Sequence, residues 1–400
     1  MRKSFSWGLL VLASVAPARA VDVTEEAFLA GLDEGHTAVR ALGADLARAE
    51  AARRRAGTLA NPRLEFWREQ PGANPSLTNW TLAWTPPLDG RFGLRKSATD
   101  AGVAAARAQQ ALDRADLRRE LRRVFADWSV GHERCALLSR RLEHVARLAE
   151  QERQRARLGA ESGLAARRLT LAEAQARADL REAEAGQGRA EAEARAWRPG
   201  LPDEAAPLVP ALPTPPEGLE AATTPRIRSG EHRLEQARLE ERLAGRFWGV
   251  PTLQAGVQRL EERGLVETGP IVAASWAIPL FDRSQAERAE ARARAEIVAS
   301  RLEQVRALTR AEIQGNRHAY QLLFAAAREA HEASAETDRV IAAATAAYRA
   351  GEAGLTDLLD ALGSAFETRL RELEVTARAL EAHRDLEAAV GRPLTEGGAR

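Results

Sequence analysis

The chain has 400 residues, of which 29% are charged and only 5% are aromatic. Lys and Arg number 58 and Asp and Glu number 57, and because the two signs are interleaved along the chain, they argue against a basic face for nucleic acid. So few aromatic residues exclude a thick globular core and favour long, thinly packed helices.

The first 20 residues have the pattern of a secretory signal peptide. Arg2 and Lys3 precede the apolar run WGLLVLASVA, and residues 18–20 (ARA) form a small-x-small cleavage site. The mature chain is therefore expected to begin at Val21, which is not the cysteine of a bacterial lipoprotein. No later stretch reaches the ~20 uninterrupted apolar residues of a membrane-spanning helix, so any membrane insertion is expected to use strands.

Two copies of one pattern follow the signal peptide. The run NWTLAWTPPLDGR at 79–91 matches IVAASWAIPLFDR at 271–283, and a glycine-rich reversal follows each run at nearly the same spacing. Landmarks in the same order indicate an internal two-fold repeat. We expect a first repeat over 21–197, a proline-rich extended linker over 198–224, a second repeat over 225–391 and a C-terminal tail over 392–400.

Each repeat is predicted to begin with a helix and two strands. Apolar and polar residues alternate in segments such as TNWTLAW, which is the pattern of a strand with two different faces. The predicted strands are 61–70 and 78–88 in the first repeat and 250–261 and 268–281 in the second.

These strands have the length that a tilted strand needs to cross a bilayer, about ten residues. Trp80, Trp84 and Trp276 are candidates for an interfacial aromatic belt. Four strands cannot close a barrel, and an open edge in lipid leaves backbone groups unsatisfied. Either several chains share one barrel, or the strands form two hairpins of a soluble sheet.

After its strands, each repeat is predicted to form a very long helical hairpin. Apolar and small residues recur in alternating steps of three and four, which is the seam of a coiled coil. The chain is expected to reverse near 157–164 and near 348–355, where glycines can supply the positive φ of a tight turn. The fold class is thus mainly α, with antiparallel coiled-coil hairpins and a small β part.

In this order, the motifs NPRLEF, TPPLDGRFG, IPLFDRSQAERAEARA, YRAGEAGLTDLLDA and LEAAVGRPL make the chain resemble the TolC-like outer membrane efflux proteins. Within that family it is most similar to the branch associated with heavy-metal cation efflux. The resemblance implies a homotrimer with one shared 12-stranded transmembrane β-barrel, continued into the periplasm by an α-barrel of helical hairpins. It also implies a periplasmic adaptor and an inner-membrane pump of the RND type as partners, and outer-membrane lipid around the barrel.

The resemblance also implies roles for the hairpin tips, which would dock the adaptor and close the duct. Asp357 and Asp360 match paired aspartates that ring the periplasmic aperture, and Tyr348 matches a tyrosine that latches the closed gate. Ala353 stands where the arginine of that latch is expected, so this closure network is incomplete. The adaptor-docking tips would be Gly159, Gly163, Leu164, Gly351, Gly354 and Leu355.

The sequence offers no sign of catalysis. The seven histidines are scattered and Cys135 is the only cysteine, so neither a metal site nor a disulfide is expected. No nucleophile grouping or nucleotide-binding loop occurs, so no cofactor and no enzymatic activity are predicted. A passive export duct is the preferred function, and a periplasmic coiled-coil scaffold without channel activity is the alternative.

Overall fold

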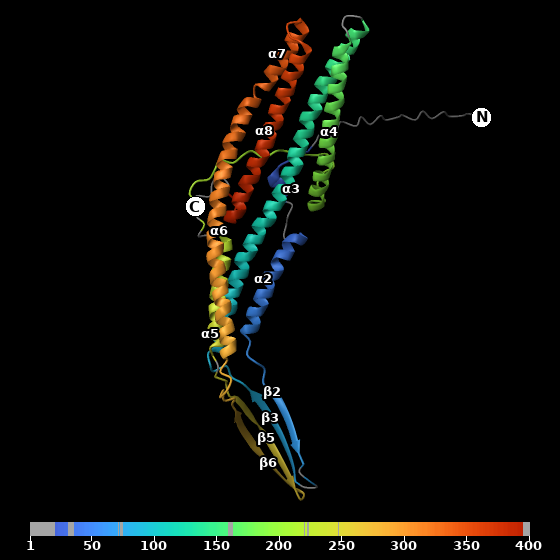
Figure 1. Cartoon of the computed structure of the whole chain (residues 1–400). Coiled ribbons are helices and arrows are strands. Elements are labelled where there is room, and N and C mark those ends of the chain that lie inside the picture. The colour runs from blue at the N-terminus through green and yellow to red at the C-terminus, as the bar shows by residue number, and fades with distance from the viewer. Residues whose placement is uncertain are drawn as a thin grey trace, which may run out of the picture.

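The computed structural model describes residues 21–30, 36–70, 72, 75–158, 163–219, 221, 224–246 and 248–394. The predicted signal peptide, Gly159 and the last six residues of the predicted tail lie outside the described residues. The molecule is a long rod with the tips of two helical hairpins at one end and a small sheet at the other (Figure 1).

Helices make up most of the rod. The first hairpin pairs α3 with α4, and the second pairs α6 and α7 with α8, while α2 and α5 lie along α3 near the sheet (Figure 1). At 1.5 Å per residue, the 67 residues of α3 span about 100 Å. The helices are α1 (Glu25–Leu29), α2 (Thr37–Ala56), α3 (Arg91–Arg157), α4 (Leu164–Trp197), α5 (Pro225–Ala244), α6 (Gln285–Ser334), α7 (Thr337–Ala350) and α8 (Leu355–Val390).

The seam predicted for the second hairpin is not one continuous helix, because Ala335 and Glu336 separate α6 from α7. The Thr337 hydroxyl donates a hydrogen bond to the Ser334 carbonyl oxygen (2.6 Å) and accepts one from Arg369 of α8 (2.7 Å). A side chain of the opposing helix therefore holds this break in place.

The four long strands form one antiparallel sheet in the order β2-β3-β5-β6. The central pairing of β3 with β5 joins strands from the two predicted repeats, with Trp80 opposite Val257 and Leu82 opposite Ala255. The strands are β2 (Arg63–Glu69), β3 (Ser76–Trp84), β5 (Thr252–Glu262) and β6 (Leu265–Ser275).

The β5–β6 hairpin is tighter than the sequence suggests. The predicted strands 250–261 and 268–281 leave six residues between them, whereas in the structure only Arg263 and Gly264 separate β5 from β6. Both residues have positive φ, 49° and 84°, as a two-residue hairpin turn matched to the strand twist requires.

The β5–β6 hairpin also ends earlier than predicted on the side that faces the helices. β6 stops at Ser275 instead of continuing to 281, because Ser275 lies opposite Thr252, the first residue of its partner β5, and leaves no strand to pair with beyond it. In the β2–β3 hairpin, β3 stops at Trp84 instead of continuing to 88, ahead of the two prolines that follow Thr85.

The proline-rich linker is tied to the first described residues of the chain. Its short strand β4 (Ala205–Pro207) pairs in parallel with β1 (Val21–Val23), and the Val21 N–H bonds to the Glu204 carbonyl oxygen (3.0 Å). Further along the linker, the Pro213 carbonyl oxygen accepts a hydrogen bond from the Tyr320 hydroxyl of α6. The linker is therefore extended but held against the helices.

Three apolar clusters hold the rod together. One packs Phe28 of α1 against Phe125 and Trp128 of α3. Another surrounds Tyr320 of α6 and Leu386 of α8. The last lies near the hairpin tips and draws on α3, α4, α7 and α8. Each cluster joins neighbouring helices along part of the rod, as expected for a molecule without a single central core.

Candidate functional sites at the two ends of the rod

The tip of the second hairpin is a glycine-bounded reversal between α7 and α8. Gly351 has a φ of 79°, and the Glu352 N–H bonds back to the Ala347 carbonyl oxygen (2.9 Å). A left-handed residue after a helix is most easily supplied by glycine. The structure thus places Gly351, Gly354 and Leu355, three of the residues predicted to form the tip, in this reversal.

Asp357 and Asp360 lie in the first two turns of α8, and both are exposed. One Asp357 carboxylate oxygen accepts a hydrogen bond from the Gly354 N–H (3.0 Å), so Asp357 caps the helix. Leu358 between them is fully buried. The helix therefore presents its two carboxylates to solvent while its opposite face packs into the tip cluster.

Tyr348 is half-buried against that cluster, whose core includes Ile341, Leu358 and Leu362. Its ring anchors the end of α7 to the start of α8. In the isolated chain, Tyr348 therefore has a packing role whatever its role in a gate.

The first hairpin tip exposes leucines beside its glycine. Gly163 has a φ of 68° and precedes α4, while Leu164 is 57% and Leu158 is 84% exposed. The sequence did not predict Leu158 as an exposed tip residue, because a leucine at the end of a coiled-coil seam has the same pattern as a buried seam residue. Exposed apolar side chains at a tip can serve as contacts for a protein partner.

A link between the two hairpins was also not predicted. The Arg168 guanidinium of α4 donates a hydrogen bond to the Thr356 hydroxyl of α8 (3.2 Å). A cationic side chain therefore approaches the tip beside Asp357 from the other hairpin, whereas Ala353 holds the position where the resemblance suggests an arginine. Sequence patterns could not predict the contact between Arg168 and Thr356, because the two residues lie far apart in the chain.

At the other end of the rod, one face of the sheet carries a band of apolar side chains. Phe66, Trp80, Val257 and Pro270 form one row across all four strands. The exposed fractions of Phe66, Trp80 and Val257 are 55%, 51% and 48%. The band also includes Leu64, Leu82, Trp84, Leu253, Ala255, Val272 and Ala274.

Toward the β5–β6 turn, the same face carries a polar row of Arg68, Thr78, Arg259 and Thr268. The opposite face is polar along the middle of the sheet, although Trp67 also lies on it. There the Gln254 amide donates to the Glu65 carboxylate (3.1 Å), and Asn79, Thr81 and Gln258 lie on the same side by their register. An apolar face of this kind that no helix covers is unusual for a protein surface in water.

The three candidate belt tryptophans lie at two levels. Trp84 ends β3 and Trp276 follows β6, so both lie at the helical end of the sheet, with their indole N–H groups bonded to the carbonyl oxygens of Ala60 (3.1 Å) and Gly249 (2.7 Å). Trp80 lies in the middle of β3, against Phe66. The predicted strand 78–88 placed Trp80 near a strand end, whereas the structure places it in the middle of β3.

A buried ionic cluster between the two ends was missing from the sequence prediction. Glu25 of α1 accepts hydrogen bonds from Arg122 of α3 (3.0 Å) and Arg384 of α8 (2.9 Å). Arg122 also pairs with Glu387. The four side chains come from three distant segments, and a single charged residue in a charge-rich sequence gives no sign of burial.

His383 lies beside this ionic cluster, with its ring 5.0 Å from that of Tyr320. Both ring nitrogens are buried without a hydrogen-bond partner. Burial, with the nearby positive charges of Arg122 and Arg384, lowers the pKa of His383 to about 4. The histidine is therefore neutral at neutral pH.

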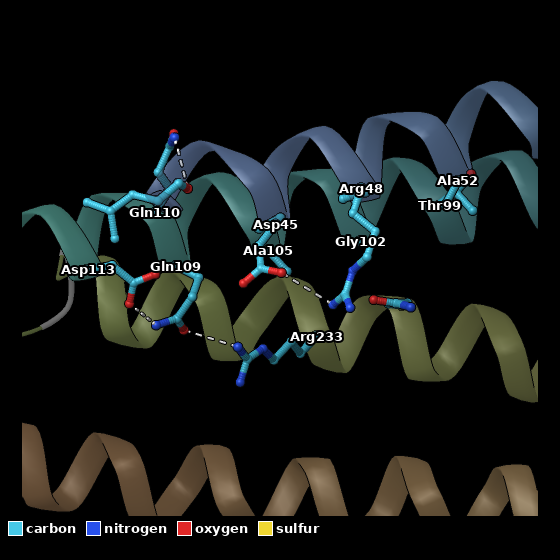
Figure 2. Close-up of a pocket in the computed structure, with 14 residues that line it drawn as sticks. Asp45, Arg48, Ala52, Thr99, Gly102, Ala105, Gln109, Gln110, Asp113 and Arg233 are labelled. Atoms are coloured by element: carbon cyan, nitrogen blue, oxygen red, sulfur yellow. Dashed lines mark hydrogen bonds and ion pairs between the residues drawn. The ribbon is translucent and has the colours of Figure 1, made fainter. Parts of the chain in front are cut away.

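A cavity of about 330 Å³ lies between α2, α3 and α5 (Figure 2). Its polar groups pair with one another: Arg233 donates to the Gln109 side-chain oxygen (3.0 Å), and the Gln109 amide donates to Asp113 (2.8 Å). Figure 2 shows these bonds along the wall formed by α3 and α5. Because its charges and amides are already satisfied, this cavity offers little to a ligand.

The described residues contain no group of three or more His, Cys, Asp or Glu side chains arranged to hold a metal ion. Among the described helices, none combines the length and apolarity needed to cross a membrane.

Comparison with known proteins agrees with this architecture. The family model described as outer membrane efflux protein matches residues 219–392. A search of curated protein sequences finds no match.

The solved structures with a similar fold include outer-membrane channels. VceC from Vibrio cholerae superposes with a TM-score of 0.75 at 17% identity, over 92% of this chain and 96% of that one. The open state of MtrE from Neisseria gonorrhoeae has a TM-score of 0.70 at 18% identity, over 99% and 98% of the two chains. CusC has a TM-score of 0.75 at 16% identity, over 92% of each chain. The chain therefore has the fold of these channels, and its second half matches the outer membrane efflux protein family.

Proposed function

We propose that this protein is the outer-membrane channel of a tripartite efflux system. Three copies would contribute four strands each to one 12-stranded barrel in the outer membrane, and their hairpins would form a periplasmic tunnel. The duct is passive: an inner-membrane pump, of the RND type in our proposal, and a periplasmic adaptor deliver the substrate. Heavy-metal cations are the substrate class that we favour, with drugs as the second.

The apolar band of the sheet carries this proposal. Lipid is the environment that suits a face with Phe66, Trp80 and Val257 exposed, and water suits the opposite face with Glu65 and Gln258. Within one chain, β2 and β6 are the edges of the sheet. Strands of neighbouring copies would pair with these edges, because unpaired backbone groups are not tolerated in lipid.

The hairpin tips support the other end of the duct. Asp357 and Asp360 are exposed on each copy, so a trimer would present six carboxylates around its axis and favour cations. Leu158 and Leu164 at the first tip would contact the adaptor.

Neighbouring residues of β5 provide the test. Val257 lies on the apolar face and Gln258 on the polar face. Replacing Val257 by Arg would place a charge in lipid, which costs about 2–4 kcal/mol near the bilayer midplane. We expect V257R to lower the amount of heat-modifiable trimer in outer-membrane fractions, whereas Q258R assembles normally. Equal assembly of the two variants, or a monomer found only in the soluble periplasmic fraction, would favour a coiled-coil scaffold instead.

A further inference from the structure

A cation-rich cavity lies at the junction of the two halves of the chain, away from both ends of the rod. It has a volume of about 240 Å³ and lies between α3 and the C-terminal end of α8. Five arginines and one carboxylate line it: Arg114, Arg118, Arg119, Arg384, Arg392 and Glu387.

Some of these charges already have partners. Arg119 pairs with Asp385 (3.0 Å) and Arg384 pairs with Glu25 (2.9 Å). The Glu387 carboxylate is engaged by Arg122 and by the Leu394 N–H (2.8 Å). Among the described residues, no carboxylate lies within ion-pair distance of three of the lining arginines: Arg114, Arg118 and Arg392. The lining therefore has more positive than negative side chains, although Arg114, Arg118, Arg119 and Arg392 are also exposed to solvent.

The deepest of the lining groups is also incompletely satisfied. The Arg384 side chain is 4% exposed, and its Nε atom is buried without a hydrogen-bond partner. Burial lowers the pKa of Arg384, and partial burial together with Arg122 lowers that of Arg118, while Glu25 acts in the opposite direction on both and Glu26 on Arg118. Buried donors without partners and crowded cations are both relieved by an anion.

The local fold brings these arginines together. Arg114 and Arg118 are four residues apart on α3 and therefore share one face of that helix. Gly391, with a φ of 76°, ends α8 and turns the chain, while the bond from the Leu394 N–H to Glu387 holds the returning segment. Arg392 is thereby placed in the same cavity as the α3 arginines.

We propose that this cavity binds a small phosphate-bearing anion that joins α3 to the C-terminal end of α8. Guanidinium groups match phosphate oxygens through paired, charge-assisted hydrogen bonds. Ligand pockets for drug-sized molecules usually enclose about 300–1,000 Å³, so the smaller volume here suits a phosphate or diphosphate group.

A soluble anion is the source that the position favours. The cavity begins near residue 111, about 20 residues beyond the start of α3 at Arg91, so it lies roughly 30 Å along the helix from the sheet. With the sheet in the outer membrane, as proposed above, lipid headgroups would not reach this point.

The test is the thermal unfolding of the full mature chain in detergent, with increasing inorganic pyrophosphate at constant ionic strength. We expect a saturable rise in the midpoint, because a ligand that binds only the folded state stabilises it. The double variant R118Q/R392Q should weaken the apparent affinity at least tenfold. The matched control is R54Q/R55Q, which removes the same charge from exposed positions on α2 and should bind as the unmodified chain does.

Circular dichroism establishes that both double variants keep their helix content. Absence of a saturable rise in the unmodified chain, or an equal response of the two double variants, would overturn the proposal. A response to phosphatidylglycerol vesicles, absent with phosphatidylcholine vesicles and with pyrophosphate, would overturn the assignment to a soluble anion.

Discussion

Glu25 offers a direct test of how the N-terminal segment is joined to the two hairpins. Its side chain is 12% exposed and accepts hydrogen bonds from two buried arginines, Arg122 and Arg384, at 3.0 and 2.9 Å. Glu25→Gln keeps the size of the side chain and removes its charge, so both guanidinium groups lose their shared partner. Breaking a buried ion pair in this way costs about 3–5 kcal/mol.

Native-state hydrogen exchange over α1 and the facing part of α3 measures this cost locally. We expect the opening free energy to fall by about 3–5 kcal/mol in E25Q, because the loss of the carboxylate leaves uncompensated buried charge. Glu26→Gln is the control, since Glu26 is exposed beside it, and its effect should stay within about 0.5 kcal/mol.

A double variant separates this interaction from general damage. In E25Q/R384Q the orphaned guanidinium is removed as well, so the total loss should be smaller than the sum of the two single losses. If E25Q behaves like E26Q, or if the two single effects simply add, the ionic cluster does not hold α1 in place.

Three further outcomes are expected. D357N/D360N, which keeps an oxygen acceptor for the Gly354 N–H, should lower the cation preference of the proposed channel in planar-bilayer conductance; unchanged selectivity would separate these residues from the aperture. Gly351→Ala should destabilise the second tip in hydrogen exchange by about 1–2 kcal/mol, because alanine resists a φ of 79°, whereas Gly363→Ala within α8 should not destabilise it. The free energy of unfolding should fall as the pH drops from about 6.5 to about 4, because His383 takes up a proton in the unfolded state at a higher pH than in the folded state. His383→Gln should remove up to ~3 kcal/mol of this pH dependence. An unchanged pH profile in the variant would contradict this account of His383.

Periodicity in the sequence was informative about the local structure at both ends of the rod. Alternation in 79–84 correctly put Trp80, Leu82 and Trp84 on one face of a strand, because successive side chains of a strand point to opposite sides. Glycines marked the chain reversals, since few other residues accept the positive φ seen at Gly163 and Gly351. The resemblance to outer membrane efflux proteins agrees with the family model over the second half and with the fold of the solved channels.

Strand ends and turns were less accurate. The polar run around Arg263 and Gly264 resembled a long loop, whereas the structure continues both strands to a two-residue turn. Backbone pairing between strands decides this length, and hydrophobic alternation weakens toward exposed strand ends.

The sequence by itself determined the long helices, the existence of the strands, the alternation of their faces and the positions of the helical reversals, because these depend on neighbours within a few residues. Only the tertiary structure decided that Glu25 meets Arg384, that Arg168 reaches Thr356, and that the arginines of α3 meet Arg392. In a chain with 58 basic and 57 acidic residues, many ion pairs are possible on charge alone. Burial and proximity select among them, and both arise only when segments hundreds of residues apart pack together.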